Sequence, residues 1–470
     1  MNSDNLDNGS PSLPPSILYP TTLVFILLQI IVMWRINDRV ANFVIFATWS
    51  RYVISVYHVI TFKPLFGGMS LIAFSSVGMV ALGLAVLRPR DLCLKFLVPC
   101  YMIVAVVVAS GLANSDLHGI INVTVKFGYL IVVTLAVFEA LWRLGEQRFM
   151  PVLLWAFVLP LALQALSIIL GIDKQTEGEG SASFIGGYSH EADFSVILVT
   201  CFIVACFCKA LPWIVRNGIL SICLVGIVFA NYRTTMIAIV PMALVQFAFG
   251  ISSRFVRDQR TFVGAVTFAV GLLAVVAVHS LLQQRFQDVA TVAESRGMMI
   301  KPPAQFSADD KRQMSGRPYI WSTYLYAYSS GSFLQHVLGF GPESWSGVMK
   351  IYAHNTLVSY LYEYGVIGVI VLIFWWVTML AAAWRIRRGP RAQLLAAHVS
   401  FILINMATMP IWMIEGNILY GIICGYTLYL LNKGRKHALA NGMKRLDWAE
   451  AGQDQGYGNI RSPYRLTPRP

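Results

Sequence analysis

Residues 353–368, AHNTLVSYLYEYGVIG, join a polar loop directly to a long apolar run. The loop before them contains SGRPYIW at residues 315–321 and GFGPESW at residues 339–345. The apolar run continues to residue 384, which exceeds the roughly 20 residues that a helix needs to cross a hydrocarbon core about 30 Å thick. We therefore expect a transmembrane helix that starts at the membrane surface, with the wet loop beside it as the place for chemistry.

The rest of the chain is also rich in apolar runs. Of its 470 residues, 57% are hydrophobic and only 13% are charged, which leaves too little polar surface to coat a soluble protein. The sequence predicts an all-α polytopic membrane protein with about 12 to 13 transmembrane helices. The predicted spans are residues 17–34, 40–60, 66–87, 94–113, 120–142, 149–171, 194–209, 218–231, 235–251, 261–281, 356–384, 392–414 and 416–431, of which 218–231 and 235–251 are short enough to be half-helices.

Basic residues recur in alternate loops between these spans. Because cytoplasmic loops carry the excess of Lys and Arg, the basic loops are predicted to be cytoplasmic. The N-terminal segment 1–16 has no Lys or Arg and is expected outside. The tail, residues 432–470, is basic and is expected to be cytoplasmic and disordered. This arrangement explains most of the net charge of +13 without a nucleic-acid partner.

Two external loops stand out. The first, residues 172–193, interrupts the transmembrane region 17–281 and contains most of EGEGSASFIGGYSHEADF. The second, residues 282–353, precedes the C-terminal transmembrane helices 354–431. Within it, YIWSTYLYAY has the amphipathic pattern typical of a helix at a membrane interface, so this loop is expected to contain short helices.

Arg233 lies in ANYRTTMIA, between two apolar pieces at the predicted external boundary. An arginine within hydrocarbon costs roughly 2.5 to 3.5 kcal/mol at a helix centre, so it is expected to face a polar partner and to mark function. The alternative is an arginine that reaches the interface and anchors a short helix. The functional interpretation is favoured because the stretch between the two apolar pieces is polar and contains Asn231, Thr234 and Thr235.

Arg317 and His354 are the other main candidates. Arg317 follows a glycine that would let the backbone approach a ligand, and a guanidinium binds phosphate oxygens with a planar fork of donors. Histidine is the side chain best suited to accept a proton near neutral pH. Gly365 and Gly368 are expected on the His354 side of the following helix, where they would open a groove below the imidazole. The alternative is that Asn355 caps the helix and the histidine only makes a hydrogen bond in an interface.

Several further polar residues are weaker candidates. Glu363 is expected on the opposite helix face, paired with an internal partner such as an arginine and not with the histidine. Lys126 and Arg51, inside predicted spans, could line the groove for a lipid donor or a path for an acceptor, or could reach the interface from a helix end. His190 and Glu191, in the first external loop, could contact the sugar or the acceptor, or could form a solvated pair.

Two arginines and one histidine at an outer face suggest a reaction. Two guanidinium groups suit a pyrophosphate, whose departure from a sugar needs its developing negative charge stabilised. An imidazole suits activation of a hydroxyl nucleophile. The sequence has no Asp-x-Asp pair for a metal, and its seven cysteines lack the spacing of a zinc site. These residues together predict a metal-free glycosyl transfer from a lipid pyrophosphate donor.

The motifs NYRTTM, SGRPYIW, GFGPESW and HNTLVSYLYEYGVIG, in this order on a many-spanning chain, resemble the O-antigen ligase and O-antigen polymerase superfamily of bacterial inner-membrane glycosyltransferases. The segment FIGGYSHEADF is similar to the loop before the central helices of that family. The resemblance implies a GT-C-like fold, no metal or other cofactor, phosphate-binding roles for Arg233 and Arg317, and catalysis by His354. The chain departs from the family pattern at Tyr232, since the first motif usually reads Ser-Arg.

The same resemblance implies the partners and the location. The donor would be an undecaprenyl-pyrophosphate-linked glycan within the membrane lipid, and the protein would lie in the bacterial inner membrane with a periplasmic N-terminus, a large periplasmic loop and a cytoplasmic C-terminus. If the acceptor is another glycan repeat, the protein polymerises O-antigen or exopolysaccharide, for which a chain-length regulator would be a further partner. If it is lipid A-core, the protein is a ligase. The polar external loops slightly favour the polymerase, and transfer to protein hydroxyls is a third option.

Other classes of membrane protein fit the sequence less well. A transporter or flippase would show two related halves with interrupted helices near the midplane, and a channel would show a polar stripe repeated over several spans. A cytoplasmic enzyme using nucleotide sugars would need a metal site or a glycine-rich phosphate loop. The sequence shows none of these patterns.

Overall fold

The computed structural model describes residues 13–66, 68–175, 182–252, 255–256, 258–281, 301–308, 310–311 and 316–454. Within these ranges the chain is helical almost throughout. Two short antiparallel hairpins interrupt the helices: β1 (Pro64–Phe66) pairs with β2 (Met69–Ser70), and β3 (Lys174–Gln175) pairs with β4 (Ala182–Ser183). The predicted all-α polytopic membrane architecture is therefore confirmed.

Every predicted span contains a helix. The first part of the chain forms α1 (Pro15–Ile36), α2 (Arg39–Val56), α3 (His58–Thr61), α4 (Leu71–Val86), α5 (Pro89–Leu92), α6 (Val98–Ala113), α7 (Leu117–Leu153) and α8 (Val158–Leu170). The middle part forms α9 (Glu191–Phe207), α10 (Trp213–Phe229), α11 (Arg233–Ala238), α12 (Val240–Ser252) and α13 (Arg260–Leu281). The last part forms α15 (Arg317–Ser329), α16 (Phe333–Leu338), α17 (Thr356–Trp384), α18 (Arg388–Asn405) and α19 (Ile414–Asp454).

Short 3-10 helices lie at Lys95–Leu97, Leu154–Phe157, Pro303–Gln305 and Pro410–Trp412. Among the described residues, six helical stretches are long and apolar enough to cross a membrane: Pro15–Ile36, Lys95–Ala113, Leu117–Leu170, Arg233–Ser252, Thr356–Trp384 and Ile414–Gly434. Shorter apolar helices cover Leu71–Val86, Trp213–Phe229 and Arg260–Leu273. The chain is thus a multi-pass membrane protein.

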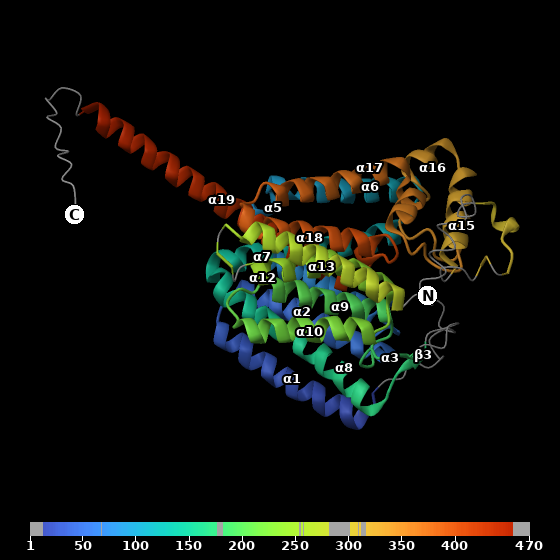
Figure 1. Cartoon of the computed structure of the whole chain (residues 1–470). Helices are drawn as coiled ribbons and strands as arrows, with labels where there is room; N and C mark the ends of the chain where they lie inside the picture. Colours follow the sequence, from blue (N-terminus) through green and yellow to red (C-terminus); the bar gives the residue numbers. More distant parts are fainter. Residues whose placement is uncertain are drawn as a thin grey trace.

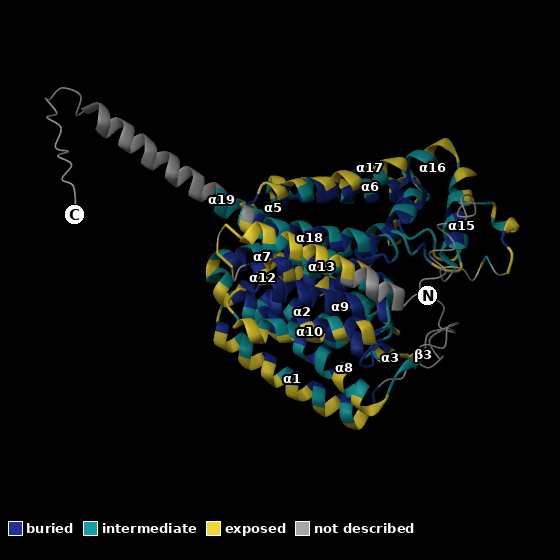
Figure 2. Ribbon diagram, viewed as in Figure 1, coloured by how far each residue is buried: buried dark blue, intermediate teal, exposed yellow. Residues whose placement is uncertain are grey.

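Helix α9 lies at the centre of the bundle and packs against α10 and α19. Almost all its residues are buried, as expected for a helix that is apolar on every side. Helix α1, in contrast, is mostly exposed and forms one edge of the bundle (Figure 2). An apolar helix at such an edge would face lipid.

The helices place the polar loops at one end of the bundle. Helices α6 and α17 lie side by side, and α15 and α16 gather at the same end as β3 (Figure 1). We call this the α15 end. The last part of α19 projects from the opposite end (Figure 1). The large loop does contain short helices, as expected, although residues 282–300 lie outside the described residues.

The C-terminal tail differs from the expectation. It was predicted to be disordered from residue 432, but α19 continues as a helix to Asp454. The added segment contains alanine, leucine, lysine and arginine, which have high helix propensity, so the helix can run on past the apolar part. Residues 455–470 and the N-terminal residues 1–12 lie outside the described residues.

Candidate functional site

The polar break around Arg233 is a turn between two helices. Helix α10 ends at Phe229, and α11 begins at Arg233 with Tyr232 as its N-cap residue. The Tyr232 hydroxyl lies 2.6 Å from the Thr408 hydroxyl, which ties this turn to the segment after α18. The residue that departs from the family pattern therefore has a structural partner here, and Arg233 occupies the first turn of α11.

Helix α15 brings Arg317 to this turn. Arg317 is the first residue of α15, and its Nη2 donates to Thr234 Oγ1 at 3.5 Å. The same helix holds the segment that leads to the histidine. Trp321 Nε1 donates to the Ala353 carbonyl at 2.9 Å, and the Tyr324 hydroxyl donates to the Ile351 carbonyl at 3.0 Å. One helix thus positions both the arginine and the backbone before His354.

His354 is held just before α17 in an unusual backbone conformation. Its φ is 53°, in the left-handed region that residues other than glycine rarely adopt, and such strain is often found at functional sites. Its ring packs against the Tyr352 ring with 4.0 Å between centroids. Its buried Nδ1 has no hydrogen-bond partner among the described residues. Burial, and then the charges of Arg317 and His190, lower the His354 pKa to about 3, so the imidazole is neutral at physiological pH.

Asn355 fixes the start of the helix that follows. Its Oδ1 accepts from the backbone N–H groups of Leu357 at 2.9 Å and Val358 at 3.3 Å. Its Nδ2 donates to the Met406 carbonyl at 3.0 Å. The capping role that the alternative interpretation expected is therefore present, and it holds the neighbouring histidine in place.

The first external loop reaches the same place. Its described part is anchored by Phe184, which donates from its backbone to the Phe229 carbonyl at 2.9 Å, and by Tyr188, whose hydroxyl donates to the Tyr52 carbonyl at 3.1 Å. His190 caps α9 by accepting from the Ala192 N–H at 3.0 Å. Glu191 is buried, and its carboxylate lies 3.7 Å from the partly exposed His190 and 3.6 Å from Lys174.

Tyr352 lies between a cationic and an acidic side of the site. Burial, and next the neighbouring Tyr232, raise the pKa of the Tyr352 hydroxyl, and it also interacts electrostatically with Arg317, Asp193 and Glu191. The cationic side consists of Arg317 and the first turn of α11. The acidic side consists of Glu191 and Asp193 at the start of α9. The imidazole is close enough to Arg317 and His190 for both positive charges to act on it.

Arg51 lies beneath the acidic side in a buried ion pair. Its Nε and Nη2 donate to the two carboxylate oxygens of Glu415 at 2.8 and 3.1 Å, and the Ser55 hydroxyl donates to the same carboxylate at 2.7 Å. Arg51 also interacts electrostatically with Asp193. The guanidinium is thus held by Glu415, and the groove-lining role considered from the sequence stays a prediction.

Lys126, Glu363 and Gly365 form a separate cluster. Lys126 Nζ donates to Glu343 Oε1 at 2.6 Å, and the Glu343 backbone N–H donates to Glu363 Oε2 at 2.7 Å. Glu363 therefore pairs internally, as predicted, but with a backbone amide and not with an arginine. The expected groove of Gly365 and Gly368 is wrong, because α17 is broken at Gly365 (φ 63°, ψ −164°) and the helical periodicity does not continue through it.

The structure thus brings together Arg317, His354, His190 and the turn that carries Arg233. Three participants were missed: Tyr352, Asp193 and Glu343. Tyr352 stands two residues before the histidine and Glu343 lies inside GFGPESW, so both were within reach of the motif analysis. Among the described residues, no group of three or more His, Cys, Asp or Glu side chains is placed to hold a metal ion.

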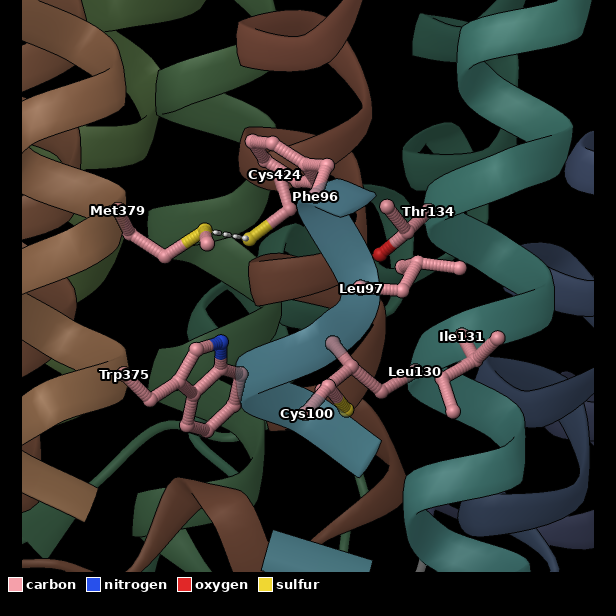
Figure 3. A pocket seen from close by; sticks show the side chains of 9 residues that line it. All are labelled: Phe96, Leu97, Cys100, Leu130, Ile131, Thr134, Trp375, Met379 and Cys424. Carbon is pink, nitrogen blue, oxygen red and sulfur yellow. Dashed lines mark hydrogen bonds between the residues drawn. The ribbon is translucent and has the colours of Figure 1, made fainter. Parts of the chain in front are cut away.

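A small apolar pocket lies elsewhere in the bundle. Figure 3 shows its lining from α6, α7, α17, α19 and the 3-10 turn before α6, with Cys424 Sγ 3.9 Å from Met379 Sδ. At 1.5 Å per helical residue, Met379 lies on the order of 30 Å along α17 from its start. The pocket therefore does not belong to the site around His354.

The comparison with known families concerns the same part of the chain. Residues 218–373 match the model of the O-antigen ligase family, a range that includes Arg233, Arg317 and His354. No curated protein matches the chain. The match supports glycosyl transfer of the O-antigen ligase or polymerase type. Residues 218–373 of the chain therefore match the O-antigen ligase family, which supports the resemblance to the O-antigen ligase and polymerase superfamily.

Proposed function

We propose that this protein transfers a glycan from undecaprenyl pyrophosphate to a sugar hydroxyl at the periplasmic face of the bacterial inner membrane. The observation that carries the proposal is the meeting of Arg317, Thr234 and His354 at the α15 end. Arg317 contacts Thr234 at 3.5 Å and acts electrostatically on the imidazole. A diphosphate bound by Arg317 and Arg233 would therefore have its sugar next to the base.

The reaction needs few groups. The acceptor hydroxyl oxygen attacks the anomeric carbon of the donor, the bond from that carbon to the phosphate oxygen breaks, and the bonding electrons leave with the diphosphate. The arginines stabilise the charge that develops on this leaving group. His354 takes the proton of the acceptor hydroxyl and later releases it to solvent.

The distribution of charge also indicates which side of the site each substrate occupies. Glu191 lies 3.6 Å from Lys174, and burial raises the Asp193 pKa to about 7, so the start of α9 carries little net charge for a diphosphate to bind. The donor diphosphate therefore belongs on the side of Arg317 and Arg233. The acceptor sugar then lies on the acidic side, where carboxylates can accept hydrogen bonds from its hydroxyls. A diphosphate on Arg317 would offset the positive charge that lowers the His354 pKa, and donor binding would thereby make the imidazole a better base.

Purified protein and a lipid-pyrophosphate-linked glycan provide the direct test. The wild type is expected to release undecaprenyl pyrophosphate and to form a longer or relocated glycan. His354→Ala and Arg317→Ala should assemble normally and lose transfer. His336→Ala is the matched control, because this histidine also lies at the α15 end, in α16, and contacts Tyr328. Full transfer by His354→Ala would contradict the proposal, and so would movement of the intact lipid-linked glycan across the membrane as the only activity.

The acceptor decides between two forms of the reaction. We favour polymerisation of O-antigen or exopolysaccharide repeats, since the acidic side offers hydrogen-bond acceptors for a polar glycan. The matched family, described as O-antigen ligase, makes transfer to lipid A-core the second candidate. Gel analysis of envelope glycans after deletion of the gene separates them. Lipopolysaccharide with a single repeat would indicate a polymerase, whereas uncapped lipopolysaccharide with accumulated lipid-linked polymer would indicate a ligase.

A further inference from the structure

Three ionisable residues join α7, the loop after α16 and α17. Glu343, in the loop, accepts from Lys126 Nζ at 2.6 Å and from Asn122 Nδ2 at 3.0 Å, both on α7. Its backbone N–H donates at 2.7 Å to Glu363 of α17, whose other carboxylate oxygen accepts from the Ser359 hydroxyl. We call Lys126, Glu343 and Glu363 the latch.

The latch lies where α17 is broken. The unusual backbone at Gly365 interrupts the helical hydrogen bonds, which leaves nearby carbonyl groups in need of other donors. The loop supplies them: Phe340 N–H donates to the Tyr362 carbonyl at 2.9 Å, and Gly341 N–H donates to the Glu363 carbonyl at 3.1 Å. The Ser110 hydroxyl of α6 is a second donor to the Glu363 carbonyl, at 2.8 Å. The loop thus holds the break in one conformation.

Aromatic contacts connect this junction to the candidate site. The Phe340 ring stacks on Tyr362 at 4.7 Å, and Tyr362 meets the ring of Tyr324 on α15 at 5.2 Å. The Tyr324 hydroxyl in turn donates to the Ile351 carbonyl, three residues before the histidine. The part of α17 before the break therefore packs directly on the helix that begins with Arg317. A shift at the junction would move the imidazole relative to the guanidinium.

We propose that Glu343 is a positioning residue, which sets the placement of His354 against Arg317 by fixing the break in α17. The inference rests on the proposed function of these two residues. If the Lys126–Glu343 ion pair had only a structural role, its removal would change the stability of the protein but not kcat of the folded protein. Lys126 and Glu343 are each only about a quarter exposed, at 23% and 24%, so breaking the pair also costs stability, and the positioning role is shown by a loss of kcat in protein that is still folded.

Glu343→Gln keeps the size of the side chain and the backbone donor to Glu363, but weakens the contact with Lys126. We expect kcat of transfer to fall about tenfold or more in the folded protein, because small misplacements of reacting groups are costly, with the donor KM unchanged. Lys126→Met should lower kcat by a similar factor, and the double variant should be no worse than either single variant. Additive losses in the double variant, or an unchanged kcat in Glu343→Gln, would overturn the proposal.

Glu146→Gln is the matched control. Glu146 also accepts from a lysine, Lys433 at 2.9 Å, and from one neutral donor, the Tyr426 hydroxyl at 3.1 Å, but it lies near the other end of α7. This variant should leave kcat unchanged. Equal losses in Glu146→Gln and Glu343→Gln would mean a general effect on the bundle and would also overturn the proposal.

A distance measurement separates this inference from the proposed function. Spin labels at the exposed positions Tyr326 of α15 and Ile370 of α17, with the exposed Cys93 replaced by serine, report the placement of α15 across the break. Glu343→Gln should broaden the distance distribution, and Glu146→Gln should not. Broadening in a protein that fails to transfer glycans would contradict the function but support the latch. Transfer by the wild type, with no broadening in Glu343→Gln, would support the function and overturn the latch.

Discussion

Arg317 donates a hydrogen bond to Thr234 at 3.5 Å, although the two residues lie 83 positions apart in the chain. Thr234 follows Arg233 in the first turn of α11, and Arg317 is the first residue of α15. Two arginine-bearing helix starts therefore meet at one place. Under the proposed function, the two guanidinium groups would supply the charge that a donor diphosphate needs.

The shape of the Arg317 side chain should matter as much as its charge. Arg317→Ala is expected to lower kcat/KM for transfer by about 10²- to 10³-fold, the loss seen when one stabilising donor is removed from a developing oxyanion. Arg317→Lys keeps the charge but loses the planar fork, so we expect at least about a tenfold loss. Thr234→Val removes only the long hydrogen bond and should cost less than either. Full activity in Arg317→Lys would show that charge alone is needed.

The His354 pKa should respond to the neighbouring arginine. In the free protein it is lowered to about 3, first by burial and then by Arg317 and His190. Because a positive charge disfavours protonation, Arg317→Gln should raise this pKa, and so should binding of pyrophosphate to the wild type. NMR titration of labelled histidine side chains, with the His354 signal assigned by its loss in His354→Gln, measures both shifts. Pyrophosphate that left the pKa unchanged would place the anion elsewhere.

The same shift has a consequence for activity. The pH dependence of kcat/KM for the donor reports the free enzyme. It should show no loss from His354 protonation until the pH approaches the His354 pKa of about 3. The kcat profile reports the complex with donor, where the His354 pKa is raised, so kcat should begin to fall at a higher pH. Rates measured between pH 4 and 8 at low and at saturating donor separate the two profiles. An acid limb at the same pH in both would mean that the donor does not act on the imidazole.

The sequence predicted the helices well and the junctions less well. Apolar length alone indicates a span such as α17, because a membrane demands about 20 apolar residues. The break at Gly365 was not predictable. The helical periodicity that placed this glycine on the His354 side applies only to an unbroken helix. The break depends on donors from Phe340 and Gly341, which only the folded chain brings near.

The candidate site shows the same limit. Arg317 and His354 stood out because of their chemistry, whereas their partners depend on contacts distant in sequence. Lys126 and Glu343, for example, are 217 positions apart. The sequence left Arg51 the options of a donor groove, an acceptor path or the interface, and did not reveal its ion-pair partner, Glu415. Residue type can therefore identify a charged residue as a candidate, but only the tertiary structure shows whether that residue already has an ion-pair partner.

Arg51 gives a prediction about stability. Arg51→Met leaves the buried Glu415 without its cation, and breaking a buried pair in this way costs about 3–5 kcal/mol. Arg51→Met combined with Glu415→Leu removes both charges and should recover most of that loss. Arg90→Met, at an exposed arginine 3.8 Å from Asp91, is the control and should cost less than about 1 kcal/mol. Reversible unfolding in mixed micelles gives the free energies.

The activity of the double variant shows whether Arg51 binds substrate. If the pair only supports the floor of the site, Arg51→Met with Glu415→Leu should keep substantial transfer activity. A stable double variant without any donor binding would instead give Arg51 the groove-lining role considered from the sequence.

The two glycines at the break should be the least replaceable in the junction. Gly365 has a φ of 63°, and a Cβ there would overlap the carbonyl group of Val337. Gly339 has a φ of 78°, and a Cβ there would overlap the backbone of Glu363. Gly347 is the control, since its φ is 83° but a Cβ would meet nothing within 4 Å. Gly347→Ala should cost only the strain of a left-handed conformation, about 1–2 kcal/mol.

Gly365→Ala and Gly339→Ala meet a larger strain, because ψ values of −164° and −173° at positive φ lie in a region essentially restricted to glycine, and they must also separate two backbones in contact. We expect each to lower the free energy of unfolding by at least about 3 kcal/mol. Because both substitutions open the same contact between α17 and the loop after α16, the double variant should lose less than the sum of the single losses. Unfolding titrations of the three variants and the control measure this. Strict additivity would mean that the glycines serve separate contacts, and a loss in Gly365→Ala no larger than in Gly347→Ala would mean that the loop does not hold the break.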